Sequence, residues 1–435
     1  MTARIVRIEA LAIAALAIAA CSDNKKDLLS PQAPDKLYVL EPKTPILRPY
    51  LPNPDDFMEI AAGGDHTCAR QYDGDVYCWG LEGEAGYGRI DSVPKIAFTG
   101  AKQVVVGGTH ACILNGAGSA YCRGGGNSGQ LGLQLGAQIG YGAGWVLGPK
   151  DPNSLGTLPP LAYSSLAAAG SSTCGMTTSG LMYCWGMAGN VNPQQMTSIP
   201  WAILTPGNYS PFFNQVAIGN QHVCGMVYGE VDCYGNDQFG QAGSDPNNTF
   251  YYPGTKIVLV AMATDLRTDV RRISSQGDFT CADMNSGTVR CFGFNWDGNL
   301  GNAAGSFSFT SQAVGNGQQL SGVAAGFRHA CALDANSEAW CWGYNYWGMV
   351  GNGTWSYSTS SAQKVLGQST GYQTNGATIK FRALAAGREH TCGISNDNHI
   401  YCWGHNNFRQ LGTWLVGANG QTLAGGWVPA PVFVM

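Results

Sequence analysis

The sequence predicts an all-β protein built from seven copies of one strand and hairpin unit. Three observations predict it. Fourteen of the 15 cysteines come in seven pairs, each pair brackets a turn signal, and the copies recur about every 54 residues over residues 58–435. The chain has 435 residues, of which 61 are glycine and only 12% are charged. Repeats of about 40–50 residues suit units of four short strands, whose open edges are protected when the units close into a ring.

Each cysteine pair is predicted to close a β-hairpin. Asp73-Gly74 lies midway between the first two cysteines, and the later copies have Gly, Asn or Ser at the second of these positions. This pattern favours a three-residue loop with a left-handed residue, whereas Tyr228-Gly229 in the shorter fourth copy favours a two-residue turn. Such hairpins place two cysteines opposite each other, within reach of a disulfide. The predicted disulfides are Cys68–Cys78, Cys112–Cys122, Cys174–Cys184, Cys224–Cys233, Cys281–Cys291, Cys331–Cys341 and Cys392–Cys402.

A metal site is the competing interpretation of the cysteines, because five copies read His-x-Cys. The histidines concerned are His66, His110, His222, His329 and His390. The sequence lacks the paired C-x-x-C of zinc-ribbon type. An exported chain also meets oxidising conditions, so we favour disulfides and expect neither a metal nor another cofactor.

Residues 1–20 are predicted to form a signal peptide. Arg4 and Arg7 precede an uncharged apolar run, Ala10 to Ala20, which is too short to cross a bilayer as a helix. The run ends Ile18-Ala19-Ala20-Cys21, which resembles the lipobox of bacterial lipoproteins. The resemblance implies that Cys21 is lipidated and begins the mature chain. The alternative is an ordinary signal that leaves Cys21 as a free thiol.

The resemblance also implies a location in the outer membrane, periplasmic or surface-exposed, because Ser22 rather than Asp follows the cysteine. Residues 21–57 contain seven prolines and no sustained apolar period. Proline at this density favours an extended chain, so we expect a tether that holds the folded body away from the membrane.

The copies share further motifs outside the hairpin. A short apolar strand ending in glycine precedes the first cysteine, as in 60–63, and an aromatic residue with glycine follows the second, as in Trp79-Gly80. Several copies add a tail like that of 129–132, Gly-Gln-Leu-Gly. This arrangement resembles the regulator of chromosome condensation repeat and implies a seven-bladed β-propeller over residues 58–435. Residues 428–434 resemble one more inter-repeat strand, which we expect to close the ring against the first blade.

The archetype of that repeat is a nuclear exchange factor for a small GTPase. We do not expect this exchange activity here, because the signal sequence and the paired cysteines do not suit a nuclear protein. A shared fold does not by itself determine function. With a net charge of −4, the chain also lacks the excess of basic residues that nucleic-acid binding requires.

The Gly-x-x-His motif before the cysteines is expected to be structural. The third copy has Ala169 and Ser172 and the fifth has Gln276 and Phe279, so glycine and histidine are lost together. Joint loss predicts a packing pair, with the imidazole bonded to nearby backbone.

One polar position should form a ring on one face of the propeller. It lies three residues before each first cysteine and holds Asp65, Thr109, Ser171, Gln221, Asp278, Arg328 and Glu389. A mixed ring of acid, base and amide suits a polar partner, and the alternative is a solvated turn.

Aromatic residues gather in the loops after the second cysteine of copies four to seven. They are Phe239, Phe294, Trp296, Tyr344, Tyr346, Trp347 and Phe408, with Trp355 and Tyr357 in the following loop. Such residues form either a binding hot spot or packing between blades. The candidate binding residues are Asp65, Asp278, Arg328, Glu389, Trp296, Tyr346 and Trp347.

Two classes of function remain open. The first is a non-catalytic binding scaffold, attached to a membrane by its lipid anchor, for a protein or glycan at the cell surface. The second is a lyase or hydrolase of propeller type, with its site at the central channel. An enzyme needs one asymmetric cluster of acid, base or metal ligands, and only Asp278, Arg328 and Glu389 suggest one. We therefore favour binding.

Overall fold

The computed structural model describes residues 56–435 apart from several short stretches. These stretches are 83–88, 134–139, 150–156, 188–196, 203–211, 244–259, 262–265, 267, 304, 316, 368–377, 413–424 and 433–435. The signal peptide, the lipidation site Cys21 and almost all of the tether lie outside the described residues. All described residues belong to one compact unit, residues 52–435.

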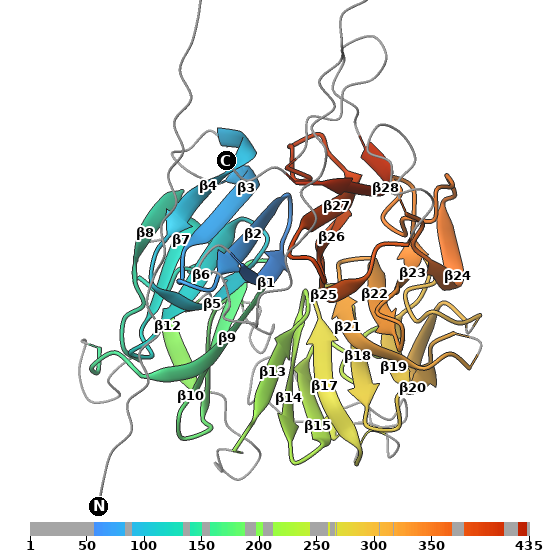
Figure 1. Ribbon diagram of the computed structural model, residues 1–435. Helices are drawn as coiled ribbons and strands as arrows, with labels where there is room; N and C mark the ends of the chain where they lie inside the picture. Colours follow the sequence, from blue (N-terminus) through green and yellow to red (C-terminus); the bar gives the residue numbers. More distant parts are fainter. Residues whose placement is uncertain are drawn as a thin grey trace, which may run out of the picture. The chain divides into compact units, whose positions relative to one another are not determined.

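This unit consists of seven four-stranded antiparallel sheets. Within every sheet the strands are neighbours in chain order, so each sheet is one blade made by one sequence repeat. Figure 1 shows the blades following one another around a ring, with β1 and β2 (blue) beside β26 and β27 (red). The predicted all-β, seven-bladed propeller is confirmed. No helix in the described part of the chain is long and apolar enough to cross a membrane.

Within each blade the four strands follow one another in order from the central channel to the periphery. The inner strands are β1 (Phe57–Ala62), β5 (Ala101–Val106), β9 (Tyr163–Ala169), β13 (Gln215–Ile218), β17 (Val270–Ser275), β21 (Leu320–Ala325) and β25 (Phe381–Ala386). The second strands are β2 (His66–Gln71), β6 (His110–Asn115), β10 (Ser172–Thr177), β14 (His222–Val227), β18 (Phe279–Met284), β22 (His329–Asp334) and β26 (His390–Ser395). The third strands are β3 (Val76–Glu82), β7 (Ala120–Gly125), β11 (Met182–Gly186), β15 (Glu230–Gly235), β19 (Val289–Phe294), β23 (Ala339–Tyr344) and β27 (Ile400–His405). The outer strands are β4 (Arg89–Phe98), β8 (Tyr141–Trp145), β12 (Thr197–Ala202), β16 (Val260–Ala261), β20 (Phe307–Ala313), β24 (Ser358–Lys364) and β28 (Gly425–Pro431).

The second and third strands of each blade form the predicted stapled hairpin. All seven disulfides are present, and their Cα atoms lie 4.0–4.1 Å apart. In the first hairpin Gly74 has φ 95°, and its N–H donates to the Gln71 carbonyl across the three-residue loop. In the fourth, Tyr228 and Gly229 both have positive φ and form the expected two-residue turn, because Val227 pairs directly with Glu230.

The glycine after the third-strand aromatic residue has a geometric cause. At Gly80 the register between β3 and β4 shifts, φ is 99°, and a Cβ atom would lie 2.5 Å from the Asp65 carbonyl oxygen. A bulge with a left-handed residue excludes a side chain there. The recurrent aromatic residue and glycine therefore reflect a bend in the third strands of blades 1, 3, 5, 6 and 7.

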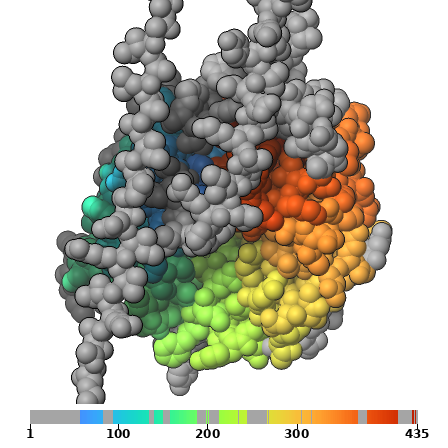
Figure 2. Space-filling model, in the orientation of Figure 1, coloured from blue at the N-terminus to red at the C-terminus, as the bar shows by residue number. Residues whose placement is uncertain are grey.

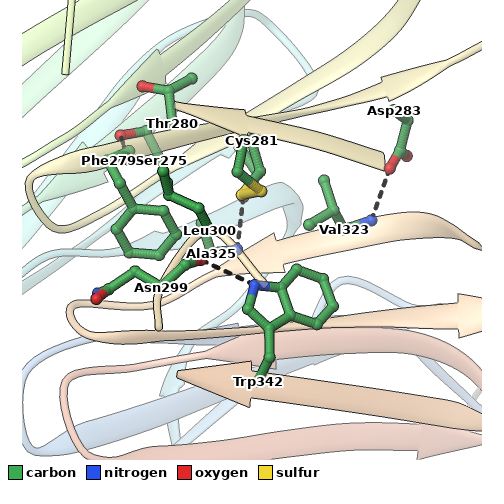
Figure 3. The surroundings of a disulfide bond; sticks show 12 residues. Ser275, Phe279, Thr280, Cys281, Asp283, Asn299, Leu300, Val323, Ala325 and Trp342 are labelled. Carbon is green, nitrogen blue, oxygen red and sulfur yellow. Dashed lines mark hydrogen bonds between the residues drawn. A yellow bond between two sulfur atoms is a disulfide. The ribbon is translucent and has the colours of Figure 1, made fainter. Parts of the chain in front are cut away.

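The hydrophobic core is divided among the blade junctions. Seven clusters of buried residues are resolved in the described part of the chain, and each spans two neighbouring blades. At the junction of blades 5 and 6, Trp342 of β23 packs with Phe279 and Leu300 of blade 5. Figure 3 shows this junction around the disulfide of Cys281, where the Trp342 indole donates to the Asn299 carbonyl at 2.8 Å. In the same way Trp79, Trp185, Phe292 and Trp403 each pack on the preceding blade.

Two boundaries differ from the sequence prediction. Phe57 was placed in the tether, but it begins β1 and packs edge-on against Tyr77. Residues 428–434 were expected to close the ring against blade 1. Instead β28 pairs with β27 as the outer strand of blade 7, and Val432 packs against the cluster that contains Trp79 of blade 1. Inner strands close the ring, because β1 contacts both β25 and β26.

Candidate functional site

The five motif histidines fasten neighbouring blades together. In four of them the Nε2 atom lies 2.7–2.8 Å from the hydroxyl of a buried threonine in the next blade. The pairs are His110–Thr173, His222–Thr280, His329–Thr391 and His390–Thr67. The Thr67 hydroxyl donates onward to the Gln410 carbonyl at 3.1 Å, so the proton of the first bond must come from His390 Nε2. The predicted backbone partner is therefore wrong for these four, whereas His66 does bond to the backbone of His110.

Glycine accompanies four of the five histidines because the imidazole lies against its α-carbon, whereas a Cβ atom at Gly63 would meet the Gly107 carbonyl oxygen. A Cβ atom at Gly107 would be 2.1 Å from Cε1 of His110, and one at Gly219 would be 2.0 Å from Cε1 of His222. Burial lowers the pKa of His110 to about 3, so its ring is neutral near pH 7. This explains the joint loss of both residues in blades 3 and 5, and it gives these histidines a structural role.

Most residues that line the central channel are small or apolar, and Arg272 of blade 5 is the one charged residue among the described lining residues. The channel contains an open cavity of about 290 Å³, lined by residues of all seven blades. Blade 5 alone contributes the polar run Ser274-Ser275-Gln276, where the other blades have small or apolar residues. The Gln276 amide reaches across the axis and donates to the Ala62 carbonyl at 3.0 Å. Among the described residues no group of three or more His, Cys, Asp or Glu side chains could hold a metal ion.

The polar ring and the aromatic loops share one face of the propeller. The ring residues lie between the first and second strands of each blade, and the aromatic loops follow the third strands. Because adjacent strands are antiparallel, the first and third strands of a blade end at the same face. We call this side the loop face.

The charged ring residues each have their own partner. Asp65 lies 3.8 Å from Arg388, and burial raises the pKa of its carboxyl although Arg388 opposes this. Burial also raises the pKa of Asp278, against the hydrogen bond from Asn220. Among the described contacts, Asp278, Arg328 and Glu389 are not paired with one another.

Arg328 is held in a fixed orientation on the loop face. Its Nε and one terminal nitrogen donate to the two oxygens of Asp297, at 2.6 and 2.8 Å, and its guanidinium carbon lies 4.2 Å above the Tyr344 ring. Burial disfavours the charged form, but the hydrogen bonds that the guanidinium donates to Asp297 and Tyr357 outweigh it and raise the pKa of Arg328. The sequence analysis missed Asp297, because the equivalent position is aromatic in copies four, six and seven.

A second polar group lies at the junction of blades 7 and 1. The Glu389 carboxylate is 3.4 Å from Nδ1 of His405, and the Gln410 amide donates to the same nitrogen at 3.1 Å. Burial lowers the pKa of His405, although the nearby Asp65 opposes this shift. His405 is therefore neutral near pH 7, and the Glu389 carboxylate remains available as an acceptor.

The aromatic side chains form a continuous surface on blade 6. Tyr346 stacks on Tyr344 and meets the edges of Trp347 and Trp355, with ring centroids 5.0 and 5.8 Å away. Tyr357 packs edge-on against Tyr344 at 5.4 Å. We call these five residues the aromatic platform. Tyr344 is buried, whereas Tyr346, Trp355 and Tyr357 are 39%, 59% and 58% exposed.

The neighbouring blades extend this platform on both sides. Trp347 lies over the His405 ring of blade 7 at 4.8 Å, and Phe408 packs edge-on against the same ring. In blade 5, Trp296 is 68% exposed and rests on Phe294, which in turn contacts Phe239 of blade 4. Some of these rings therefore pack between blades, whereas others face solvent, and binding by the exposed rings stays a prediction.

The loop that carries the platform is ordered by one side chain. Asn345 accepts a hydrogen bond from the Val350 N–H and donates to the Thr354 carbonyl and the Ser356 hydroxyl. Its backbone N–H also donates to the Tyr357 carbonyl at 2.9 Å. Because Asn345 is fully buried, Trp355 and Tyr357 project from a loop that is fixed before any ligand arrives.

The fold and the loop face together define a class of protein: a repeat-built, seven-bladed β-propeller that presents an exposed aromatic and polar surface on one side. The chain carries regulator of chromosome condensation (RCC1) repeats, because the family model matches residues 59–86, 321–348 and 381–410. No curated protein sequence gives a significant match.

Several solved propellers are similar to this structure. Prp20p from Saccharomyces cerevisiae has a TM-score of 0.66 and 18% identity, over 87% of this chain and 88% of that chain. Yeast RCC1 (Prp20) bound to Kap60 has a TM-score of 0.64 and 18% identity, over 92% and 91%. Human WBSCR16 has a TM-score of 0.64 and 17% identity, over 82% and 90%. At these identities the likeness establishes the fold alone.

Proposed function

We propose that this protein is a bacterial lipoprotein, anchored to the outer membrane through Cys21, whose propeller is a non-catalytic binding scaffold for a protein or glycan partner. The aromatic platform is the observation that carries the proposal. Large rings that stay exposed on an ordered loop contribute much contact area at little cost in conformational entropy. An isolated propeller would gain nothing from leaving them exposed to water.

Two further observations support the proposal. Seven buried disulfides suit an oxidising compartment outside the cytoplasm, where a lipobox-like sequence would send the chain. The similar propeller Prp20p is described for its binding to Gsp1p and histones, and yeast RCC1 was solved with Kap60 bound. Those partners are not expected here, but they illustrate that the fold can serve as a binding platform.

Site-specific photo-crosslinking in native membranes tests the scaffold. A photoreactive residue at Trp355 should capture a defined partner, whereas the same residue at Trp145 of β8 should not. Trp145 is a matched control, because it is 51% exposed but belongs to the outer strand of blade 2. Equal capture from both positions, or none from Trp355, would contradict a binding role for the platform.

The anchor is tested by the intact mass of the protein purified from its own membranes. A di- or triacyl mass on an N-terminal Cys21, with fourteen hydrogens fewer before reduction than after it, is the expected result. An unmodified Cys21 thiol would refute the lipoprotein assignment.

A further inference from the structure

The loop face offers both hydrogen-bond donors and acceptors. On blades 5, 6, 7 and 1 its described charged residues include four carboxylates and three guanidinium groups, while His405 is neutral near pH 7. The seven residues are Asp65, Asp278, Asp297, Glu389, Arg328, Arg388 and Arg409. A polyanion or a polycation would meet repulsion from the groups that carry its own sign of charge. The surface therefore suits a ligand without net charge that both donates and accepts hydrogen bonds.

The platform loop has an unusual composition. In residues 352–361 every side chain is aromatic, hydroxyl or amide, apart from Gly353, and none is aliphatic or charged. Exposed rings in this setting offer flat apolar faces, and hydroxyl groups beside them offer hydrogen bonds. A ligand that combines an apolar face with several hydroxyl groups would match both features at once.

The exposed rings also extend over two blades. The loop that carries Trp296 in blade 5 touches β24 of blade 6, because a Cβ atom at Gly298 would lie 2.6 Å from the Thr359 carbonyl oxygen. In Figure 2 the yellow and orange blades form one continuous surface. Rings from adjacent blades can engage successive units of an extended ligand, which favours a chain of units over a single small molecule.

We infer that the platform binds a neutral oligosaccharide, an inference that rests on the proposed function and names the class of its ligand. The C–H faces of the sugar rings stack on Trp355, Tyr346 and Trp296. The sugar hydroxyls donate to Glu389 and Asp65 and accept from Arg388. Because Asn345 fixes the loop and Asp297 fixes Arg328, binding orders few side chains.

Titration of the full chain, solubilised in detergent with its disulfides intact, tests the inference. The probes are cellohexaose, maltohexaose and chitohexaose, with hexalysine and hexaglutamate as charged alternatives, and calorimetry and tryptophan fluorescence are the readouts. At least one of the three oligosaccharides should bind and quench tryptophan emission. Trp355→Ala should weaken that binding at least tenfold, whereas Trp145→Ala should bind as the wild type does.

The outcomes separate the ligand class from the proposed function. If none of the three oligosaccharides binds at millimolar concentration, or if Trp355→Ala and Trp145→Ala bind equally well, the glycan inference is refuted. Preferred binding of hexalysine or hexaglutamate would also refute it. Capture of a protein from position 355 without any glycan binding would support the binding scaffold and refute the oligosaccharide as its ligand. Trp355 is exposed, so its loss should leave the unfolding temperature unchanged and the comparison valid.

Discussion

The hydrogen bond between His329 of blade 6 and Thr391 of blade 7 should stabilise the ring measurably. His329 Nε2 lies 2.8 Å from the Thr391 hydroxyl, which donates to the Met349 carbonyl at 3.1 Å. Both side chains are fully buried. Thr391→Val keeps the shape of the side chain and removes only the hydroxyl, so it isolates this contact.

The loss of stability in Thr391→Val depends on which groups lose a hydrogen-bond partner. The Met349 carbonyl still accepts from the Trp403 indole at 2.8 Å, so it remains satisfied. The Nε2–H of His329 is left as an unpaired buried donor. One such donor costs about 1–3 kcal/mol, and we expect Thr391→Val to lower the free energy of unfolding by that amount.

At two other blade junctions this chain lacks both partners of the hydrogen bond. Where the imidazole is absent, the hydroxyl is absent too: Phe279 of blade 5 faces Ala330, and Ser172 of blade 3 faces Val223. Replacing both partners by His329→Phe and Thr391→Val removes donor and acceptor together. The double variant should therefore lose less stability than the two single variants combined, by about 1 kcal/mol or more.

Urea unfolding with the disulfides intact, followed by tryptophan fluorescence, measures this cycle. Thr178→Val is the control, because Thr178 is an exposed threonine and its change should stay within about 0.5 kcal/mol. If Thr391→Val behaves like this control, or if the double variant is additive, the inter-blade bond contributes no net stability and the argument fails.

Three other predictions concern pH, packing and the loop face. Burial lowers the pKa of the five motif histidines to about 3 or 4, so the unfolded chain binds more protons than the folded one between that pH and about 6.5. The free energy of unfolding, measured with urea, should therefore fall on acidification from pH 7 to 5, by up to ~1.4 kcal/mol per pH unit for each histidine; a flat profile would refute their buried, neutral state. Gly107→Ala should lower the unfolding temperature because its Cβ would clash with the His110 ring, and Gly107→Ala with His110→Ser should recover part of the loss, whereas an unchanged single variant would disprove the clash. Asp297→Ala removes both bonds to Arg328, so it should cost about 1.5–3 kcal/mol in the same urea assay and weaken oligosaccharide binding; wild-type values for both would exclude a positioning role.

Much of the fold could be predicted because its signals are local in the chain. The cysteines of each pair are nine or ten positions apart, and a turn residue with positive φ stands between them. Hairpin, turn type and disulfide are therefore determined by about a dozen consecutive residues, and repetition of the unit determines the number of blades.

Contacts between blades could not be predicted in the same way. His390 meets Thr67 from 323 positions away, and Arg328 meets Asp297 from 31 positions away. Such pairs depend on which surfaces face each other once the ring has closed, and no local pattern encodes that. For the same reason the sequence did not predict that the final strand pairs with β27 of blade 7, although its β character was recognised.

The candidate site shows the same division. The sequence by itself identified the aromatic and charged residues, because they interrupt an otherwise regular repeat. Only the tertiary structure decided that Tyr344 is buried beneath Arg328 while Trp355 and Tyr357 remain exposed, and that Asp278 lies with Asn220. Burial and partnership are properties of packing between blades, so they arise only when distant repeats come together.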